Sequence, residues 1–343
     1  MRIGILTGGG DAPGLNAAIR AVARRCFDRG DQPIGIRNGW AGLLGKGDVR
    51  ELASTDVSGI LHLGGTILGT SRTNPLKSEA DTAQLARNVA AFGLDAIAVI
   101  GGDDTLSVAP HLHSIGVPVV GIPKTVDNDL CETDYCIGFD TAVGTVVEAL
   151  DRLHTTASAH HRVLVTEVMG RDAGWVAVMG GIAGGADFIL IPEVSIPVEQ
   201  VCEHVQRRYA LGKDFSIIVV SEGVETPDVI SKEAIHEVDA FGHVRLDRRG
   251  VGDTLARIIE HQTGLETRVT VLGHLQRGGS PSAYDRTWAT RLGVTAVDML
   301  HDGIHGVMAA VRGQEIHPVP LDAVVGHSRR VDPSLYELAR VFY

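Results

Sequence analysis

Carboxylates and one lysine follow two apolar runs in the first half of the chain. The run 96–100 leads into the sequence GGDDT at 101–105, and the run 117–122 leads into PKTVDND at 123–129. Both runs have the length and branching of buried parallel strands, so the two segments should meet at the carboxyl edge of one sheet. Carboxylates there could hold Mg²⁺ shared with a substrate phosphate, or accept a proton from a hydroxyl. The sequence therefore predicts a catalytic edge.

Each of these segments also has a purely structural interpretation. The acids at 103–104 could lie in the first turn of a capped helix, and the Asp-Asn-Asp sequence at 127–129 is typical of polar turns. If the second segment is instead extended, Thr125, Asp127 and Asp129 point to one side of it. A hydroxyl and two carboxylates would then lie together, and one acid could tune the pKa of the other as a general base.

A glycine-rich segment, TGGGDAPGLN at 7–16, joins the first apolar run to the first helical pattern. Glycines leave backbone N–H groups open at a helix N-terminus, where anions bind. The segment is not a Walker A sequence, because no Gly-Lys-Ser/Thr follows, and it is not GxGxxG, because Pro13 occupies the last glycine position. It predicts a phosphate site, and a tight strand-to-helix turn is the alternative.

Arginine, glutamate and histidine follow apolar runs in the second half of the chain. The sequences are MGR at 169–171, EG at 222–223 and GHLQRGG at 273–279. Arginines bind phosphate through two parallel hydrogen bonds, and a carboxylate accepts from sugar hydroxyls. Together these motifs suit a phosphorylated sugar, whereas each one alone is equally compatible with a surface ion pair.

Length, composition and charge limit the class of protein. The chain has 343 residues, 44% of them apolar, which is enough for two domains with separate cores. A net charge of -11 argues against binding to nucleic acid or to acidic membranes, and no apolar run is long enough to span a bilayer. Four cysteines without a CxxC pair do not form a disulfide framework, so we expect a cytoplasmic protein.

Apolar β-rich runs alternate with helical patterns along both halves, which indicates an α/β fold with mostly parallel sheets. In the first half we expect strands at 3–6, 33–36, 96–100 and 117–122, with helices at 14–29 and 81–92. In the second half we expect strands at 162–167, 188–191, 215–221 and 268–272, with helices at 173–184 and 198–211. Two similar sheets predict two domains.

The motifs, taken in order from residue 4 to about 290, resemble the phosphofructokinase family, in the branch that includes the bacterial 6-phosphofructokinases. The resemblance implies two Rossmann-like, three-layer α/β/α domains with the active site in the cleft between them. One domain would take residues 1–138 plus about 277–325 and bind the phosphoryl donor and Mg²⁺. The other would take 139–276 plus about 326–343 and bind fructose 6-phosphate. The implied reaction is phosphoryl transfer to the 1-hydroxyl of fructose 6-phosphate, giving fructose 1,6-bisphosphate.

The same resemblance assigns roles to single residues by motif match. Asp127 would be the general base, and Asp103 would hold Mg²⁺. The other residues implied in catalysis are Thr125, Lys124, Arg171 and Asp104. The donor would meet Gly9, Gly10, Asp11, Arg72, Gly102, Asp104 and Lys124. The sugar phosphate would meet Thr125, Asp127, Asp129, Met169, Gly170, Arg171, Glu222, His274 and Arg277. Arg162 and Arg268 would reach the site of a neighbouring subunit, which implies a homo-oligomer, either a dimer or a tetramer.

Two positions bear on the identity of the donor. ATP-using members of the family commonly have glycine where this chain has Asp104 and Lys124, and the pair resembles the pyrophosphate-dependent members. The Asp104 side chain would narrow the nucleotide channel and repel the α-phosphate, and Lys124 adds a compact charge suited to pyrophosphate. We therefore expect a reversible pyrophosphate-dependent enzyme of glycolysis and gluconeogenesis. An ATP-dependent phosphofructokinase is the alternative, and a non-catalytic sugar-phosphate-binding protein is a more distant one.

One stretch departs from the compact bacterial members. The chain between Glu222 and Arg268 is longer, and the sequence at 239–244 predicts a hairpin insertion.

Overall fold

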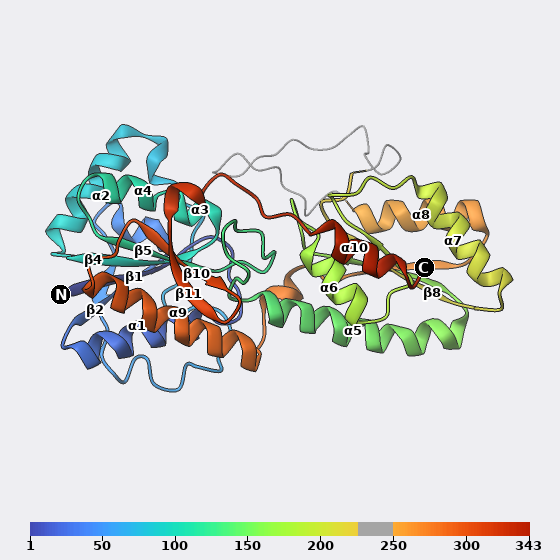
Figure 1. Cartoon of the computed structure of the whole chain (residues 1–343), viewed down its shortest axis with the longest axis horizontal. Helices are drawn as coiled ribbons and strands as arrows, with labels where there is room; N and C mark the ends of the chain where they lie inside the picture. Colours follow the sequence, from blue (N-terminus) through green and yellow to red (C-terminus); the bar gives the residue numbers. More distant parts are fainter. Residues whose placement is uncertain (226–249) are drawn as a thin grey trace. The chain divides into compact units, whose positions relative to one another are not determined.

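The chain forms two compact units, each built around its own sheet (Figure 1). The computed structural model describes residues 1–225 and 250–343, so the predicted hairpin at 239–244 lies outside the described residues. The first unit contains Met1–Thr141 and Arg277–Ser328, and the second contains residues 142–225 and 250–276 together with Arg329–Tyr343.

The first unit has a seven-stranded sheet in the order β11-β10-β5-β4-β1-β2-β3. Only the pairings of the two edge strands, β3 with β2 and β11 with β10, are antiparallel. The strands are β1 (Arg2–Thr7), β2 (Gln32–Ile36), β3 (Val49–Glu51), β4 (Ala96–Gly101), β5 (Val119–Pro123), β10 (Val307–Arg312) and β11 (Glu315–Pro320). Every residue of β4 and β5 is buried, because helices cover both faces of the sheet and leave no polar face.

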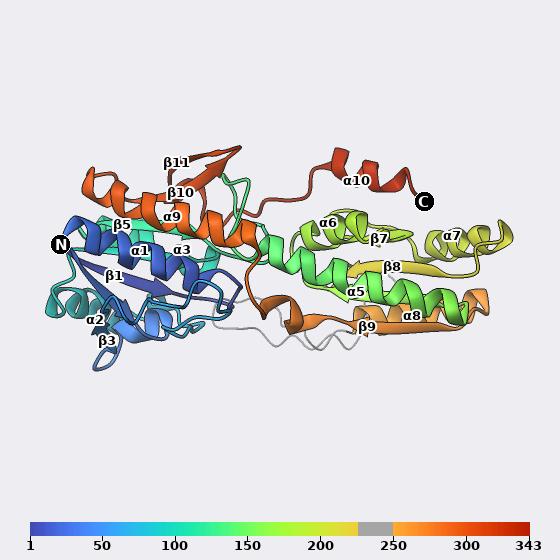
Figure 2. The ribbon, with the colours of Figure 1, turned by 90° about the horizontal axis from the view of Figure 1, so that it is seen from below.

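Helices make the outer layers of the first unit (Figure 1). Helices α2, α3 and α4 lie on one face of the sheet, and α1 and α9 pack together on the other (Figures 1 and 2). Their bounds are α1 (Leu15–Arg29), α2 (Glu79–Ala91), α3 (Asp103–Leu106), α4 (Ala109–Ser114) and α9 (Ala283–His301). Short 3-10 turns, η1 (Gly39–Leu43), η2 (Pro75–Lys77) and η4 (Leu321–Ala323), lie in the connections.

The second unit has a four-stranded parallel sheet in the order β7-β8-β6-β9. The strands are β6 (Val163–Val168), β7 (Phe188–Leu190), β8 (Ser216–Ser221) and β9 (Thr267–Val271). Its helices are α5 (Phe139–His160), whose first turn belongs to the first unit, α6 (Trp175–Ala183), α7 (Val198–Ala210), α8 (Val251–Thr263) and α10 (Pro333–Arg340). A 3-10 turn, η3 (Gly273–Arg277), follows β9.

The predicted α/β class with mostly parallel sheets is confirmed, and each strand predicted from an apolar run is present within a few residues. The sequence patterns did not predict α5, α8, α9, α10 or the pair β10 and β11. No helix in the described part of the chain is both long enough and apolar enough to cross a membrane.

A buried carboxylate joins α9 to the start of α5. Asp285 lies in the first turn of α9 and has no solvent exposure. Its Oδ1 accepts hydrogen bonds from the Tyr135 hydroxyl and the Gly138 N–H, each at 2.6 Å, and its Oδ2 accepts one from the Thr141 N–H at 2.9 Å. Burial raises the pKa of Asp285, and these donors act against that shift. The segment from Tyr135 to Thr141 is thereby fixed to α9.

We predict that Asp285→Ala lowers the free energy of unfolding by about 3–5 kcal/mol, the range for removing one partner of a buried charged network. The substitution leaves the buried donors of Tyr135 and Gly138 without their acceptor. Denaturant titration measures the change. Asp302→Ala, which removes an exposed acid at the other end of α9, is the matched control. Equal effects of the two substitutions would contradict the structural role of Asp285.

Candidate functional site

The glycine-rich loop between β1 and α1 is held closely by its neighbours. Gly9 has a φ of 76° and donates its N–H to the Ser71 carbonyl at 3.1 Å, while the Thr70 hydroxyl donates to the Gly9 carbonyl at 2.6 Å. A Cβ on Gly8 would lie 2.6 Å from the Thr105 side chain, so only glycine fits there. The predicted donor segments 8–10, 69–72 and 101–105 are therefore brought together in the first unit.

Lys124 lies beneath this loop and is almost fully buried, with 3% of its surface exposed. Its Nζ donates to the Gly8 carbonyl at 3.0 Å and to the Gly10 carbonyl at a shorter distance. Burial, together with the charge of Arg277, lowers the pKa of Lys124 from 10.5 to about 7, although Asp11 and Asp127 favour the charged form. A lysine ammonium thus supports the backbone of the loop from behind.

Arg277 also contacts the glycine loop. Its Nη1 donates to the Asp11 carbonyl at 3.1 Å, and a Cβ added to Gly10 would lie 2.5 Å from that same Nη1. The motif match assigns Arg277 to the sugar phosphate, whereas the structure places it in the first unit beside the predicted donor loop.

Asp103 and Asp104 form the first turn of the four-residue helix α3, with Gly102 at the N-cap. The helix-cap interpretation is therefore correct for their backbone. The carboxylate of Asp103 accepts a hydrogen bond from the Gly326 N–H at 2.8 Å, which fixes one of its oxygens. Among residues 1–225 and 250–343, no cluster of three or more His, Cys, Asp or Glu residues could hold a metal ion.

The segment that contains Asp127 is a turn, so of the two interpretations of 125–129 the polar turn describes its backbone and the extended form does not. Strand β5 ends at Pro123, Lys124 forms an isolated bridge to Ile137, and Val126 and Asp127 form the turn. Asn128 adopts a φ of 51°, a left-handed conformation that asparagine tolerates well, and its Oδ1 accepts the Cys136 N–H at 2.9 Å. The Asp127 N–H is bonded to the Thr125 hydroxyl at 3.1 Å. The turn, rather than a pleated strand, determines where Thr125, Asp127 and Asp129 point.

The carboxyl ends of β6, β8 and β9 bring the predicted sugar-phosphate motifs together in the second unit. The Ser221 hydroxyl donates to the Gly170 carbonyl at 2.5 Å, and a Cβ on Gly223 would lie only 1.9 Å from the Arg171 carbonyl. The Met169 N–H donates to Oε1 of the fully buried Gln276 at 3.2 Å. Glycine in MGR and EG is therefore required by close backbone packing. Glu222 directly follows β8, and His274 lies in η3.

Arg162 and Arg268 share one carboxylate. Arg162 precedes β6, Arg268 lies on the adjacent strand β9, and their Nη2 atoms lie 2.8 and 2.5 Å from Oε1 of Glu266. The Arg162 guanidinium is the main cause of the lowered pKa of Glu266. The two arginines thus lie side by side, an arrangement in which two guanidinium groups can bind the same anion. Their predicted role in a neighbouring subunit stays a prediction.

Sequence reasoning missed three residues that support these loops: Asp285, Gln276 and Glu193. Gln276 stands inside the motif GHLQRGG, so the motif itself was a signal. Asp285 and Glu193 had no recognisable signal, because their partners are distant in the sequence.

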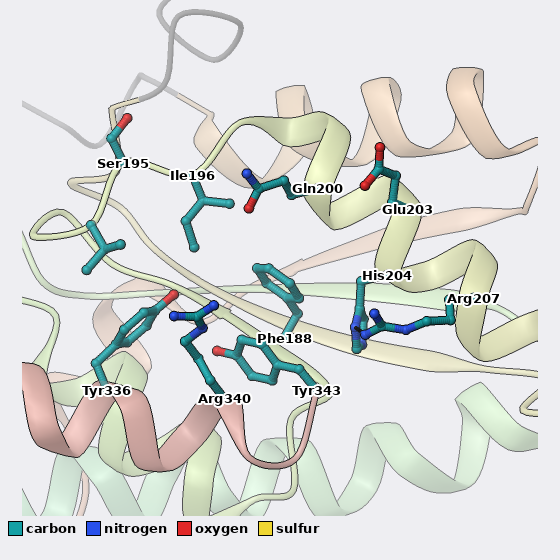
Figure 3. Close-up of a pocket in the computed structure, with 11 residues that line it drawn as sticks. Phe188, Ser195, Ile196, Gln200, Glu203, His204, Arg207, Tyr336, Arg340 and Tyr343 are labelled. Atoms are coloured by element: carbon teal, nitrogen blue, oxygen red, sulfur yellow. Dashed lines mark hydrogen bonds between the residues drawn. The ribbon is translucent and has the colours of Figure 1, made fainter.

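A separate cavity lies wholly within the second unit, between β7, α7 and α10 (Figure 3). Its volume is about 620 Å³. Phe188 lies at its centre, and the side chains of Tyr336, Arg340 and Tyr343 face Ile196 and Gln200 across it (Figure 3). None of the residues predicted to act in catalysis or binding lines this cavity.

Comparison with known proteins identifies the class to which this arrangement belongs. The family model described as phosphofructokinase matches residues 2–300. The chain is 53% identical to a pyrophosphate--fructose 6-phosphate 1-phosphotransferase of Streptomyces coelicolor, over 100% of both chains. It is 50% identical to the enzyme of the same name from Dictyoglomus thermophilum, over 100% of this chain and 99% of the relative.

Other relatives carry a different name. An ATP-dependent 6-phosphofructokinase of Chloroflexus aggregans is 49% identical over 97% of this chain and 93% of its own. Among solved structures, Pichia pastoris phosphofructokinase in the T-state superposes with a TM-score of 0.82 and 32% identity, over 99% of this chain and 36% of that one. The chain belongs to the phosphofructokinase family.

The burial of Lys124 gives a testable pH dependence. Its pKa is about 7 in the folded protein and near 10.5 when unfolded, so between these values the unfolded state binds one more proton. The free energy of unfolding of the wild type should therefore rise relative to Lys124→Met by roughly 1.4 kcal/mol per pH unit above pH 7. Denaturant titrations between pH 7 and about 9.5 measure the difference. Lys46→Met, which removes an exposed lysine, is the control. If the free energy of unfolding of Lys124→Met changed with pH in parallel with that of the wild type, the burial effect would be contradicted.

Proposed function

We propose that the protein transfers a phosphoryl group from pyrophosphate to the 1-hydroxyl of fructose 6-phosphate, reversibly, giving fructose 1,6-bisphosphate and phosphate. Family membership supports the class of reaction. Relatives at 50–53% identity over the full chain carry the name pyrophosphate--fructose 6-phosphate 1-phosphotransferase, which supports the donor. The observation that carries the choice of donor is the position of Lys124 directly behind the glycine loop.

The loop and Lys124 together make a site for a compact polyanion. Glycine at position 124 would remove both the charge and the hydrogen bonds to the Gly8 and Gly10 carbonyls. Because pyrophosphate has no ribose or base, its two phosphates must supply all of the binding energy, and a fixed positive charge near them compensates for the missing contacts. Asp104 lies in the first turn of α3, and its negative charge would repel the α-phosphate of a nucleotide bound beside it.

Positioning and charge stabilisation carry most of the rate enhancement in phosphoryl transfer. We assign Asp127 as the base that accepts the proton of the attacking hydroxyl, and Thr125 as the residue that holds the turn through its bond to the Asp127 N–H. Arg171, Arg72 and Lys124 would balance charge on the transferred group.

The acidic residues fit Mg²⁺ rather than a metal that needs a preformed cage. Mg²⁺ keeps several waters and is usually bound by one or two carboxylates together with substrate phosphates. In the described part of the chain the protein offers single carboxylates instead of a cluster of three. Asp103 would hold the ion, which would neutralise phosphate charge when bound.

The first unit would bind the donor, with Gly9, Gly10, Asp11, Arg72 and Gly102 beside Lys124 and Asp104. The second unit would bind the sugar phosphate through Met169, Gly170, Arg171, Glu222 and His274, with Asp129 from the catalytic turn. Arg162 and Arg268 would complete the 6-phosphate site of a neighbouring subunit in a dimer or tetramer. Arg277 contacts the glycine loop, so we expect it to contribute near the donor as well as to the sugar.

An ATP-dependent reaction is the second candidate, because a relative with that name is 49% identical to this chain. Asp104 and Lys124 favour pyrophosphate over it.

The choice of donor is tested by assaying purified protein with fructose 6-phosphate, Mg²⁺ and either pyrophosphate or ATP. We expect turnover with pyrophosphate to exceed turnover with ATP by at least about 100-fold, the size of discrimination that a few charged contacts provide. The variant Asp104→Gly/Lys124→Gly should lose pyrophosphate activity and gain relative activity with ATP. Turnover of the wild type with ATP alone would overturn the donor assignment.

The role of Asp127 is tested by Asp127→Asn. We expect kcat to fall by about 10²- to 10⁴-fold, the usual contribution of a general base, while binding of fructose 6-phosphate is largely retained. Steady-state kinetics and equilibrium binding of the sugar phosphate separate the two effects. An unchanged kcat would remove Asp127 from the role of base.

A further inference from the structure

Glu193 connects two separate stretches of the second unit. Its carboxylate accepts the Gly174 N–H through both oxygens, at 3.0 and 3.1 Å, and Oε1 also accepts the Val331 N–H at 2.9 Å. Gly174 is the N-cap of α6, and Val331 belongs to the segment that leads into α10. One carboxylate thus satisfies the N–H groups of two chain segments that are far apart in the sequence.

The loop that carries Arg171 ends at Gly174, the N-cap of α6, which Glu193 binds. Only two residues separate Arg171 from Gly174 along the chain, and one of them, Ala173, is fully buried. A Cβ on Gly174 would lie 2.4 Å from Ile191, and a Cβ on Gly170 would lie 2.7 Å from the Ala173 carbonyl. The loop is therefore fixed at its beginning by β6 and at its end by Glu193.

The second partner of Glu193 belongs to a well-anchored segment. The Trp175 Nε1–H donates to the Arg329 carbonyl at 3.0 Å, and the Arg329 guanidinium lies over the Trp175 ring, 4.2 Å from its centroid. Further on, the Tyr336 hydroxyl donates to the Ile189 carbonyl at 3.0 Å, and the Tyr343 hydroxyl accepts the Ile189 N–H at 3.0 Å. Both tyrosine side chains extend from the carboxyl-terminal segment toward β7 (Figure 3). Val331 is therefore a firm support for Glu193.

The residues just before this segment, 326–328, belong to the first unit and make contacts there. The Gly326 N–H donates to Asp103 at 2.8 Å, and Ser328 forms a bridge with Leu130, directly after Asp129.

We propose that Glu193 is a positioning residue for the sugar-phosphate loop Met169–Arg171. This proposal rests on the proposed function. Glu193 binds the N–H groups of Gly174, at the start of α6, and of Val331, before α10. These bonds fix the position of the end of the loop and therefore the position of the Arg171 backbone. The Arg171 guanidinium donates a hydrogen bond to the neighbouring Asp172 at 2.8 Å, and the place of its backbone decides where this side chain can reach.

A helix cap without functional consequence is the competing explanation. Loss of a simple cap would lower stability and leave the ratio of the two Michaelis constants unchanged. Loss of a positioning contact would weaken binding of the sugar phosphate selectively, because the loop held by Glu193 belongs to the sugar-binding motifs and the donor loop lies in the other unit.

The experiment compares Glu193→Ala, Glu193→Gln and the wild type in the full chain, with KM measured separately for fructose 6-phosphate and for pyrophosphate. Glu193→Ala should raise KM for fructose 6-phosphate by roughly tenfold, the effect of losing hydrogen bonds to a charged group, and should change KM for pyrophosphate by less than about twofold. Glu193→Gln keeps an acceptor oxygen, so it should restore KM to within about threefold of the wild type. Glu337→Gln, which removes an exposed acid on α10, is the control for charge in the same unit.

The outcomes distinguish failure of the positioning role of Glu193 from failure of the proposed function. The positioning role is supported if the wild type turns over both substrates and Glu193→Ala raises KM for fructose 6-phosphate but not KM for pyrophosphate. Equal changes in both Michaelis constants, or no change in a folded variant, overturn it while leaving the proposed function intact. Absence of wild-type turnover with fructose 6-phosphate and pyrophosphate overturns the proposed function instead. If Glu193→Ala does not fold, Glu193→Asp takes its place, because its carboxylate is one methylene shorter and reaches Gly174 and Val331 less well. A selective rise in KM for fructose 6-phosphate then supports the positioning role, and a KM equal to that of Glu337→Gln overturns it.

Discussion

The buried carboxylate of Asp285 is the constraint on which the predicted catalytic turn depends. It binds Tyr135, Gly138 and Thr141, and the strand partner of Lys124 is Ile137, within the same segment. The side chain of Asn128 bonds to Cys136 in that segment, so the turn around Asp127 is built on a support that α9 holds in place. A fully buried acid is costly unless every oxygen is bonded, and here the hydrogen bonds that offset this cost also order the segment 135–141 that supports the predicted turn.

The glycine loop shows a related compromise between burial and charge. A lysine that donates to two backbone carbonyls gives up part of its charge near neutral pH, because burial favours the neutral amine. An anion bound on the other side of the loop would favour the ammonium form again. Lys124 can thus serve as a structural donor when the site is empty and as a counter-charge when an anion is bound. A residue with both roles constrains the loop more than glycine at the same position would.

The sequence predicted the parts of the fold that depend on local pattern. Strands β4 and β5 are continuous apolar runs because they are covered on both faces, so their ends, and the acids that follow them, could be placed at one edge of the sheet. The conformation at 125–129 could not be predicted by alternation, because the side chain of Asn128 bonds to a segment six to eight residues away and fixes a turn. Asp285 and Glu193 could not be identified either. Their partners lie up to 150 residues away along the chain, and nothing in a single sequence indicates such pairs.

Arg277 shows how far a motif match alone can direct an assignment. The motif groups it with His274, yet Arg277 itself belongs to the first unit, and its guanidinium donates to the Asp11 carbonyl. The planar guanidinium has five donors in a fixed geometry, so one bond to the glycine loop leaves others available to a phosphate. Lysine, with a single compact charge, would not provide the same geometry at this position.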